Sequence, residues 1–231
     1  MAQTAGSAVD GRFLRPTSFI DSDHPAVLAF AQAHTQGAAT DRERAVQLFY
    51  AVRDRIRYDA FGLTFVPENY KASHVLAEGE AYCIPKAILL AAAARAVGIP
   101  SSLGFGDVVN HLASERLLAL MESNVFVWHG NTNLFIDGAW RKATPAFNIE
   151  MCERFGVKPL EFDGVHDSLL HPFDANNNQH MEYVGDHGDF ADFPAEQVFT
   201  EMRANYPLFA RLLDEGRLRE ALAAPVSPAV G

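Results

Sequence analysis

The chain has 231 residues, of which 48% are hydrophobic, so it is long enough to bury one sizeable core. Its 29 acidic and 19 basic residues give a formal net charge of -10, and no block of Lys and Arg occurs. A nucleic-acid partner is therefore not expected, because binding to phosphates requires concentrated positive charge. No segment reaches the length of a membrane span, and the N-terminus lacks the apolar run of a signal peptide. We expect a cytoplasmic protein without a membrane partner.

The sequence predicts one domain with a flexible tail at each end, because no linker or internal repeat divides it. The predicted parts are an N-terminal tail (1–18), a domain (19–223) and a C-terminal tail (224–231). Within the domain we expect a core (about 45–148), a long polar loop (about 156–194) and closing helices (195–223).

The first predicted elements are helices. Asp23 and Pro25 are typical of a helix start. A second helix is expected in residues 41–59, where apolar residues recur at three- and four-residue intervals. Residues 59–70 read as a loop, and 71–82 as a short helix and turn.

The next predicted helix is apolar on nearly all sides and runs from about Pro85 to Val97. Proline suits the first turn, and Gly98 followed by Pro100 ends the helix. Cys83 lies at the start of this helix, where unpaired N–H groups and the helix dipole favour an anion. We therefore expect a lowered thiol pKa and a reactive cysteine.

Strands are expected after the apolar helix. Residues 102–109 and 122–130 are rich in β-forming residues, and residues 132–145 read as two strands joined at Asp137 and Gly138. Two amphipathic helices, at about 195–205 and 208–223, close the chain. Helices followed by strands predict an α+β fold in which the Cys83 helix packs against an antiparallel sheet.

A thiol nucleophile needs a base, and the base needs a group that orients it. Among nine histidines, His129 is the best candidate because it lies near the end of a predicted strand facing the Cys83 helix. His111 is the second candidate. Cys152 lies in a short helical pattern and is interpreted as a packing residue.

These features together resemble the transglutaminase-like superfamily of cysteine enzymes. The resemblance is carried by the cysteine turn, the apolar helix ending in RAVGIP, the histidine, and the strand pair with Asp-Gly and Trp140. Segments such as YCIPKAILLAAAARAVGIP, KATPAFN and CERFGVKPLEFDG are similar to a bacterial transglutaminase-like cysteine protease subgroup. The resemblance implies a papain-like core, with Cys83 as nucleophile and His129 as base.

The sequence departs from the family pattern at the third catalytic position. The aspartate expected there reads as Thr144, immediately before Pro145. Threonine can accept a hydrogen bond from an imidazole but cannot offset imidazolium charge. Three candidates could orient His129: Thr144, Asn148 and Asp107.

The resemblance implies acyl transfer or hydrolysis at an amide (peptide or isopeptide) or thioester carbonyl, through a thioester on Cys83. The expected partner is a peptide, a protein or a small amide or thioester substrate, and no cofactor or metal is expected. The sequence does not choose between water and an amine as second nucleophile, and it leaves substrate-binding residues and oligomeric state open.

Two other functions remain open at this stage. A binding module that keeps the fold without the chemistry would account for the missing aspartate. A metal-dependent hydrolase would use the polar loop, although the spacing of its side chains fits no standard motif. The residues concerned are His166, Asp167, His171, Asp174, His180, Glu182 and His187.

Overall fold

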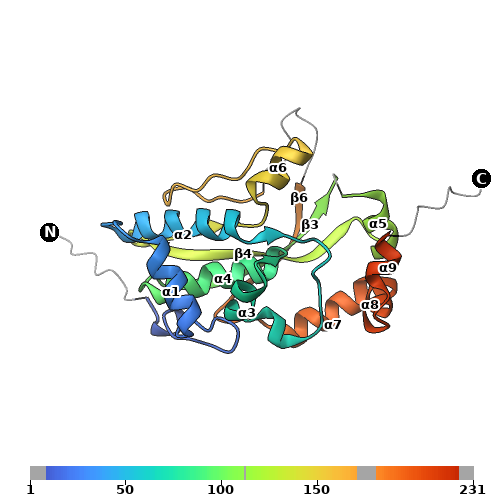
Figure 1. Ribbon diagram of the computed structural model, residues 1–231, viewed down its shortest axis with the longest axis horizontal. Helices are drawn as coiled ribbons and strands as arrows, with labels where there is room; N and C mark the ends of the chain where they lie inside the picture. The colour runs from blue at the N-terminus through green and yellow to red at the C-terminus, as the bar shows by residue number, and fades with distance from the viewer. Residues whose placement is uncertain (1–8, 112, 171–180, 224–231) are drawn as a thin grey trace, which may run out of the picture.

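A computed structural model describes residues 9–111, 113–170 and 181–223 of the chain (Figure 1). It has an α+β fold in which helices pack against a four-stranded antiparallel sheet, as the sequence predicts. Residues 1–8 and 224–231 of the predicted tails lie outside the described residues. The helical elements are η1 (Gly11–Phe13), α1 (Pro25–His34), α2 (Asp41–Arg55), η2 (Pro67–Tyr70), α3 (Ala72–Glu78), α4 (Cys83–Ala96), α5 (Glu115–Met121), α6 (Ile149–Phe155), α7 (Ala195–Asn205), α8 (Pro207–Asp214) and α9 (Leu218–Ala223).

The main sheet has the strand order β5-β4-β3-β6. Its strands are β3 (Ser101–Asn110), β4 (Val125–Ile136), β5 (Ala139–Ala143) and β6 (Met181–Phe190). The predicted hairpin at Asp137 and Gly138 is confirmed, since β4 pairs with β5 across this turn and both residues have positive φ, 49° and 83°.

The sequence interpretation was wrong in two places within this sheet. Residues 122–130 and 132–136 were expected to form separate strands, but Asn131 continues the ladder and they form the single strand β4. The polar loop expected at 156–194 contains the edge strand β6, which pairs with β3. Its Gly, Asp and His residues hide the alternation that usually marks a strand.

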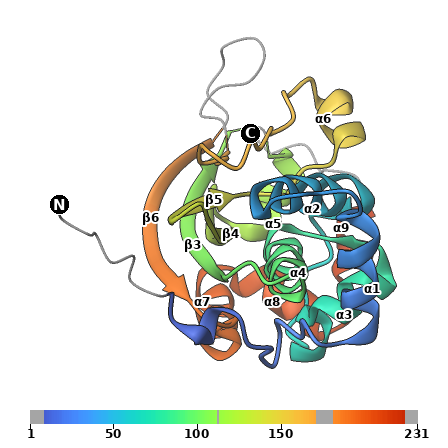
Figure 2. The same cartoon turned by 90° about the vertical axis from the view of Figure 1, so that its left-hand side faces the viewer.

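Helix α4 lies at the centre of the molecule. Figure 2 shows the curved sheet on one side of α4, and α1, α2 and α3 on the other. Every residue from Cys83 to Arg95 is buried, which explains why the sequence of this helix lacks a polar face. A short parallel pair, β1 (Arg57–Tyr58) with β2 (Glu80–Ala81), leads the chain into the helix. No described helix is both long enough and apolar enough to cross a membrane.

The charged side chains of α4 are buried and bind backbone carbonyls. The Nζ atom of Lys86 donates to the carbonyl oxygens of Arg53 (2.8 Å) and Ile56 (2.5 Å) at the end of α2. Arg95 donates to the carbonyls of Ser101 and Ala191, each at 2.7 Å. These bonds satisfy carbonyls that a helix end and loops would otherwise leave unpaired.

Burial lowers the pKa of Lys86 to about 7, and nearby Asp54 opposes this effect. Because the pKa of an unfolded lysine is about 10.4, the unfolded chain binds more protons between these values. The contribution of Lys86 to the unfolding free energy therefore rises with pH from about 7 to 10. We expect Lys86→Met to reduce the unfolding free energy by about 1 to 3 kcal/mol at pH 9.5, and by less at pH 7.

Urea unfolding at the two pH values measures this difference. Comparing each variant with wild type at the same pH removes the contributions of the neighbouring groups Arg53, Asp54, Glu150 and Cys152. The control is Lys71→Met at an exposed position, which should change the unfolding free energy by less than about 0.5 kcal/mol. If Lys86→Met reduces the unfolding free energy by the same amount at both pH values, the lowered pKa of buried Lys86 is contradicted.

Candidate active site

Cys83 is the first residue of α4, preceded by Tyr82 in an extended conformation. Pro85 lies in the first turn, where its missing N–H has no helical partner to lose. The Tyr82 side chain is fixed by a 2.6 Å hydrogen bond between its hydroxyl and that of Tyr70. The sequence therefore places the thiol at a rigid helix start, as predicted.

The first turn of α4 lies directly against β4 at Gly130. A Cβ atom at Gly130 would lie 3.2 Å from the Cα atom of Ile84, which is tighter than ordinary contact, so a side chain there would require the helix or the strand to shift by a few tenths of an ångström. The backbone N–H groups of Gly130, Ile84 and Cys83 lie close enough to the sulfur to lower the pKa of the thiol. The thiol is thus held among backbone donors.

His129 precedes Gly130 on β4 and is 6% exposed. Cys83 and His129 line the same small cavity, of about 80 Å³. The Nε2 atom of His129 is buried and has no hydrogen-bond partner among the described residues. A lone pair is therefore available at this nitrogen whenever it carries no proton. The structure brings together the two residues that the sequence singled out.

Burial determines the charge state of this pair. It raises the pKa of the Cys83 thiol from 9.0 to about 11, although three backbone N–H groups lower it. It also lowers the pKa of His129 from 6.5 to about 4. The expectation of a lowered thiol pKa was therefore wrong for the free protein, because desolvation outweighs the helix terminus. At neutral pH the pair is a thiol and a neutral imidazole.

A β-bulge immediately precedes His129. Gly106 pairs with His129 and Val108 with Phe126, so two residues of β4, Val127 and Trp128, lie opposite Asp107 of β3. Trp128 has φ of +61°, a left-handed conformation that is strained for a bulky residue. Bulges bend a strand and re-aim the side chains beside them, so this one sets the direction of His129.

Side chains from other elements hold the bulge in place. The Trp128 N–H donates to Oδ1 of Asp107 at 3.0 Å, and the Val127 N–H donates to the Tyr206 hydroxyl at 2.6 Å. The same Asp107 oxygen is 2.7 Å from Nε2 of His187, whose ring stacks on the Trp128 indole with centroids 4.0 Å apart. Both amides that the bulge removes from the ladder are therefore satisfied.

The three candidates for orienting His129 have different surroundings. Asp107 binds Trp128 and His187 as described above. Asn148 accepts from the Tyr58 N–H at 3.0 Å and donates to Glu150 at 2.5 Å, so its amide is engaged elsewhere. None of the three lines the cavity that Cys83 and His129 share.

The Thr144 hydroxyl is buried without a hydrogen bond of standard geometry among the described residues, although it lies close enough to the Tyr183 phenol to influence the pKa of that group. The Tyr183 ring also packs edge-on against His129, with centroids 6.3 Å apart. Thr144 therefore stays the first candidate for the third position.

Other sequence candidates lie away from this cavity. His111 is 4.0 Å from Glu182. Cys152 is a free, buried cysteine in α6, as a packing role requires. Within the described ranges, no three His, Cys, Asp or Glu residues are placed to hold a metal ion. Of the residues considered for a metal site, His171, Asp174 and His180 lie outside the described residues.

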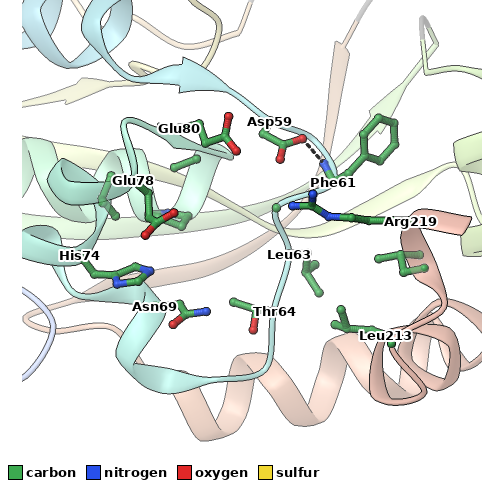
Figure 3. Close-up of a pocket in the computed structure, with 16 residues that line it drawn as sticks. Asp59, Phe61, Leu63, Thr64, Asn69, His74, Glu78, Glu80, Leu213 and Arg219 are labelled. Carbon is green, nitrogen blue, oxygen red and sulfur yellow. Dashed lines mark hydrogen bonds between the residues drawn. The ribbon is translucent and has the colours of Figure 1, made fainter. Parts of the chain in front are cut away.

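A second and larger cavity, of about 360 Å³, borders the start of α4 through Ala81 and Pro85. Figure 3 shows Asp59, Glu78 and Glu80 around one part of it, with Arg219 reaching in from α9. Neither Cys83 nor His129 lines this cavity. We therefore place the candidate site in the smaller cavity, which holds both the thiol and the imidazole.

Several contributors to the site were not found from the sequence. Gly130 and Tyr206 carry no local signal for their contacts, and His187 was considered only as a metal ligand. Their roles arise from contacts between segments far apart in the chain, which periodicity does not reveal.

Residues 28–145 match the family described as the transglutaminase-like superfamily. Two solved structures align with 58% of this chain. A "putative cysteine protease" from Cytophaga hutchinsonii is 19% identical with a TM-score of 0.45, and 40% of that chain is covered. A "putative protease" from Parabacteroides distasonis is 15% identical with a TM-score of 0.37, and 26% of that chain is covered. The alignments thus span less than half of either protein. No curated protein matches the chain in sequence.

The bulge contacts give a prediction that does not depend on any activity. Asp107→Ala leaves the Trp128 N–H without its acceptor, so we expect the unfolding free energy to fall by about 1 to 3 kcal/mol. Asp107→Asn retains an oxygen acceptor and should lower the unfolding free energy by less. Urea unfolding followed by tryptophan fluorescence measures both. Equal losses in the two variants would show that the Asp107 charge, rather than its acceptor oxygen, holds the bulge.

Proposed function

Because this chain belongs to the transglutaminase-like superfamily, we propose that it is a cysteine enzyme that cleaves or transfers an acyl group through a thioester on Cys83. One observation carries the proposal: the thiol at the start of α4 and the imidazole of His129 line a single buried cavity. A further argument is the unpartnered Nε2 of His129, which is the kind of atom that a general base requires.

The mechanism begins with a neutral pair. His129 takes the proton from Cys83 as the sulfur attacks the substrate carbonyl carbon, so charge develops only when substrate is present. Backbone N–H groups at the helix start stabilise the tetrahedral oxyanion. His129 then gives the proton to the leaving group as the carbon–heteroatom bond breaks. Water or an amine completes the cycle by attacking the thioester.

The orientation of His129 is proposed to depend on Thr144 and on the bulge. Threonine offers a neutral acceptor or donor, which suits an imidazole that is itself neutral at rest. An aspartate would also stabilise the imidazolium ion that forms when His129 takes the proton, whereas Thr144 is uncharged and can only orient the ring.

The substrate class that fits this chemistry is an amide or thioester, in a peptide, a protein or a small molecule. Both hydrolysis and transfer to an amine pass through the same acyl-enzyme. Product analysis with and without an added amine separates the two outcomes once acylation is established.

The two cysteines provide a matched test of the nucleophile. We expect an activated ester to add one acyl group to wild type and to Cys152→Ala, but none to Cys83→Ala. Both cysteines are buried, so burial alone does not distinguish them. Intact-mass spectrometry before and after hydroxylamine treatment detects the thioester. Acylation that persists in Cys83→Ala would contradict the proposed nucleophile.

The neutral pair predicts an unusual pH dependence. Because burial raises the thiol pKa to about 11, alkylation of Cys83 by iodoacetamide should keep rising above pH 9 in wild type and in His129→Ala. Acylation by substrate at pH 7.5 should instead fall by roughly 100-fold or more in His129→Ala, since it needs the base. If Cys83 alkylation instead has a pH midpoint near or below 7, and this midpoint rises in His129→Ala, the pair is a preformed thiolate–imidazolium pair and the mechanism is contradicted.

The raised thiol pKa also supports a second candidate, a binding module that keeps the fold without catalysis. Such a module would bind a ligand in the cavity while Cys83 stays unacylated. The comparison of Cys83→Ala and Cys152→Ala distinguishes the two functions, because a pure binding module forms no thioester with any ester.

A further inference from the structure

The cavity that Cys83 and His129 line is otherwise apolar except for Asn110. Its walls come from the strands β1, β3, β4 and β6 and from the helices α5, α7 and α8. Most of the wall side chains are buried, and the cavity is partly open to solvent. The described apolar and aromatic lining residues are Tyr58, Ala60, Leu63, Tyr82, Val108, Leu117, Met121, Phe126, Val127, Trp128, Phe147, Met181, Met202, Tyr206 and Phe209.

The polar atoms of these walls are largely committed to the protein. The Tyr82 hydroxyl binds Tyr70, and the Tyr206 hydroxyl donates to the Val125 carbonyl at 2.8 Å while accepting from Val127. Among the described lining residues, no carboxylate, ammonium or guanidinium group is present. A charged group entering this cavity would lose its hydration without compensation.

Part of the wall lies outside the part of the chain that matches the family. The match ends at residue 145, whereas Met181, Met202, Tyr206 and Phe209 come later in the sequence. Flexible methionine side chains from three elements (Met121, Met181 and Met202) can adjust to different apolar shapes.

We propose that this cavity is the acyl-binding pocket, and that the substrate is an amide, ester or thioester of a carboxylic acid with a small branched aliphatic group. The proposal rests on the proposed function. The acyl part is assigned here because it stays on the sulfur through the reaction, whereas the leaving group must reach solvent. The volume of about 80 Å³ is roughly half that of a cavity of about 150 Å³ that binds benzene, so it fits a small aliphatic group rather than a ring.

The covalent step fixes what the pocket must hold. The Cys83 sulfur forms a bond to the acyl carbon, the bond from that carbon to nitrogen, oxygen or sulfur breaks, and the thiol proton passes through His129 to the leaving group. The apolar group remains in the cavity as a thioester until water or an amine attacks.

The test measures acylation of the full chain by four p-nitrophenyl esters: acetate, 3-methylbutanoate, phenylacetate and the hemiester of succinate. Rates of nitrophenolate release, with Cys83 modification verified by intact mass, are divided by the rates with glutathione to remove intrinsic reactivity. We expect the 3-methylbutanoyl ester to react at least about tenfold faster than acetate, and the phenylacetyl ester to lack this advantage because its ring exceeds the cavity. The succinyl ester should react more slowly than acetate, because its carboxylate has no partner in the cavity.

Variants of the lining residues then test whether this cavity causes the preference among the esters. Leu117→Phe narrows the cavity and should reduce the advantage of the 3-methylbutanoyl ester to less than about threefold, while Ala119→Phe, exposed on the same helix, should keep it. Met202→Ala enlarges the cavity from α7 and should shift the preference toward phenylacetate. If Leu117→Phe does not fold, Met202→Ala tests whether this cavity sets the preference among the esters.

The outcomes separate this inference from the proposed function. Equal normalised rates for all four esters, or a preference for succinyl, would overturn the apolar pocket while Cys83 acylation still stands. Failure of every ester to acylate Cys83 would overturn the proposed function and the inference with it.

Discussion

The close contact between the first turn of α4 and β4 is the constraint on which the site depends. Gly130 permits it, because any side chain there would meet the backbone of Ile84. The contact buries Cys83, brings the Gly130 backbone close enough to lower the pKa of the thiol, and places His129 beside the same cavity. The buried helix, the sheet and the site are therefore parts of one packing arrangement.

The same contact decides the chemistry of the thiol. A helix N-terminus stabilises an anion by about 0.3 to 1 kcal/mol, whereas the rise in the pKa of Cys83 by two units corresponds to about 3 kcal/mol. Burial is the larger effect, so a cysteine at a helix start is not an activated thiolate here. Under the proposed function, such a thiol would need a base to remove its proton when substrate binds.

The sequence predicted much of the fold because its strongest signals are local. The apolar run of α4, the proline in its first turn and the Asp-Gly turn each determine structure within a few residues. Strand β6 was missed because its Gly, Asp and His residues conceal the pattern of an edge strand. The structure places Cys83 and His129, which the sequence singled out as nucleophile and base, at one cavity, but the bulge could not be predicted. Its register shift depends on pairing between strands, and its bonds depend on Asp107 and Tyr206, which are distant in sequence.

The bulge offers an alternative to the missing aspartate of the family pattern. An acidic third residue orients a histidine by binding its ring, whereas here the backbone before His129 is fixed instead. Trp128 keeps its strained conformation because Asp107 binds its N–H, His187 stacks on its ring and Glu201 accepts from its Nε1 at 2.8 Å. His187 and Glu201 belong to β6 and α7, beyond the part of the chain that matches the family. The later segments of the chain therefore contribute to the site in two ways. They hold the strand that carries His129, and they form part of the wall of the cavity that Cys83 lines.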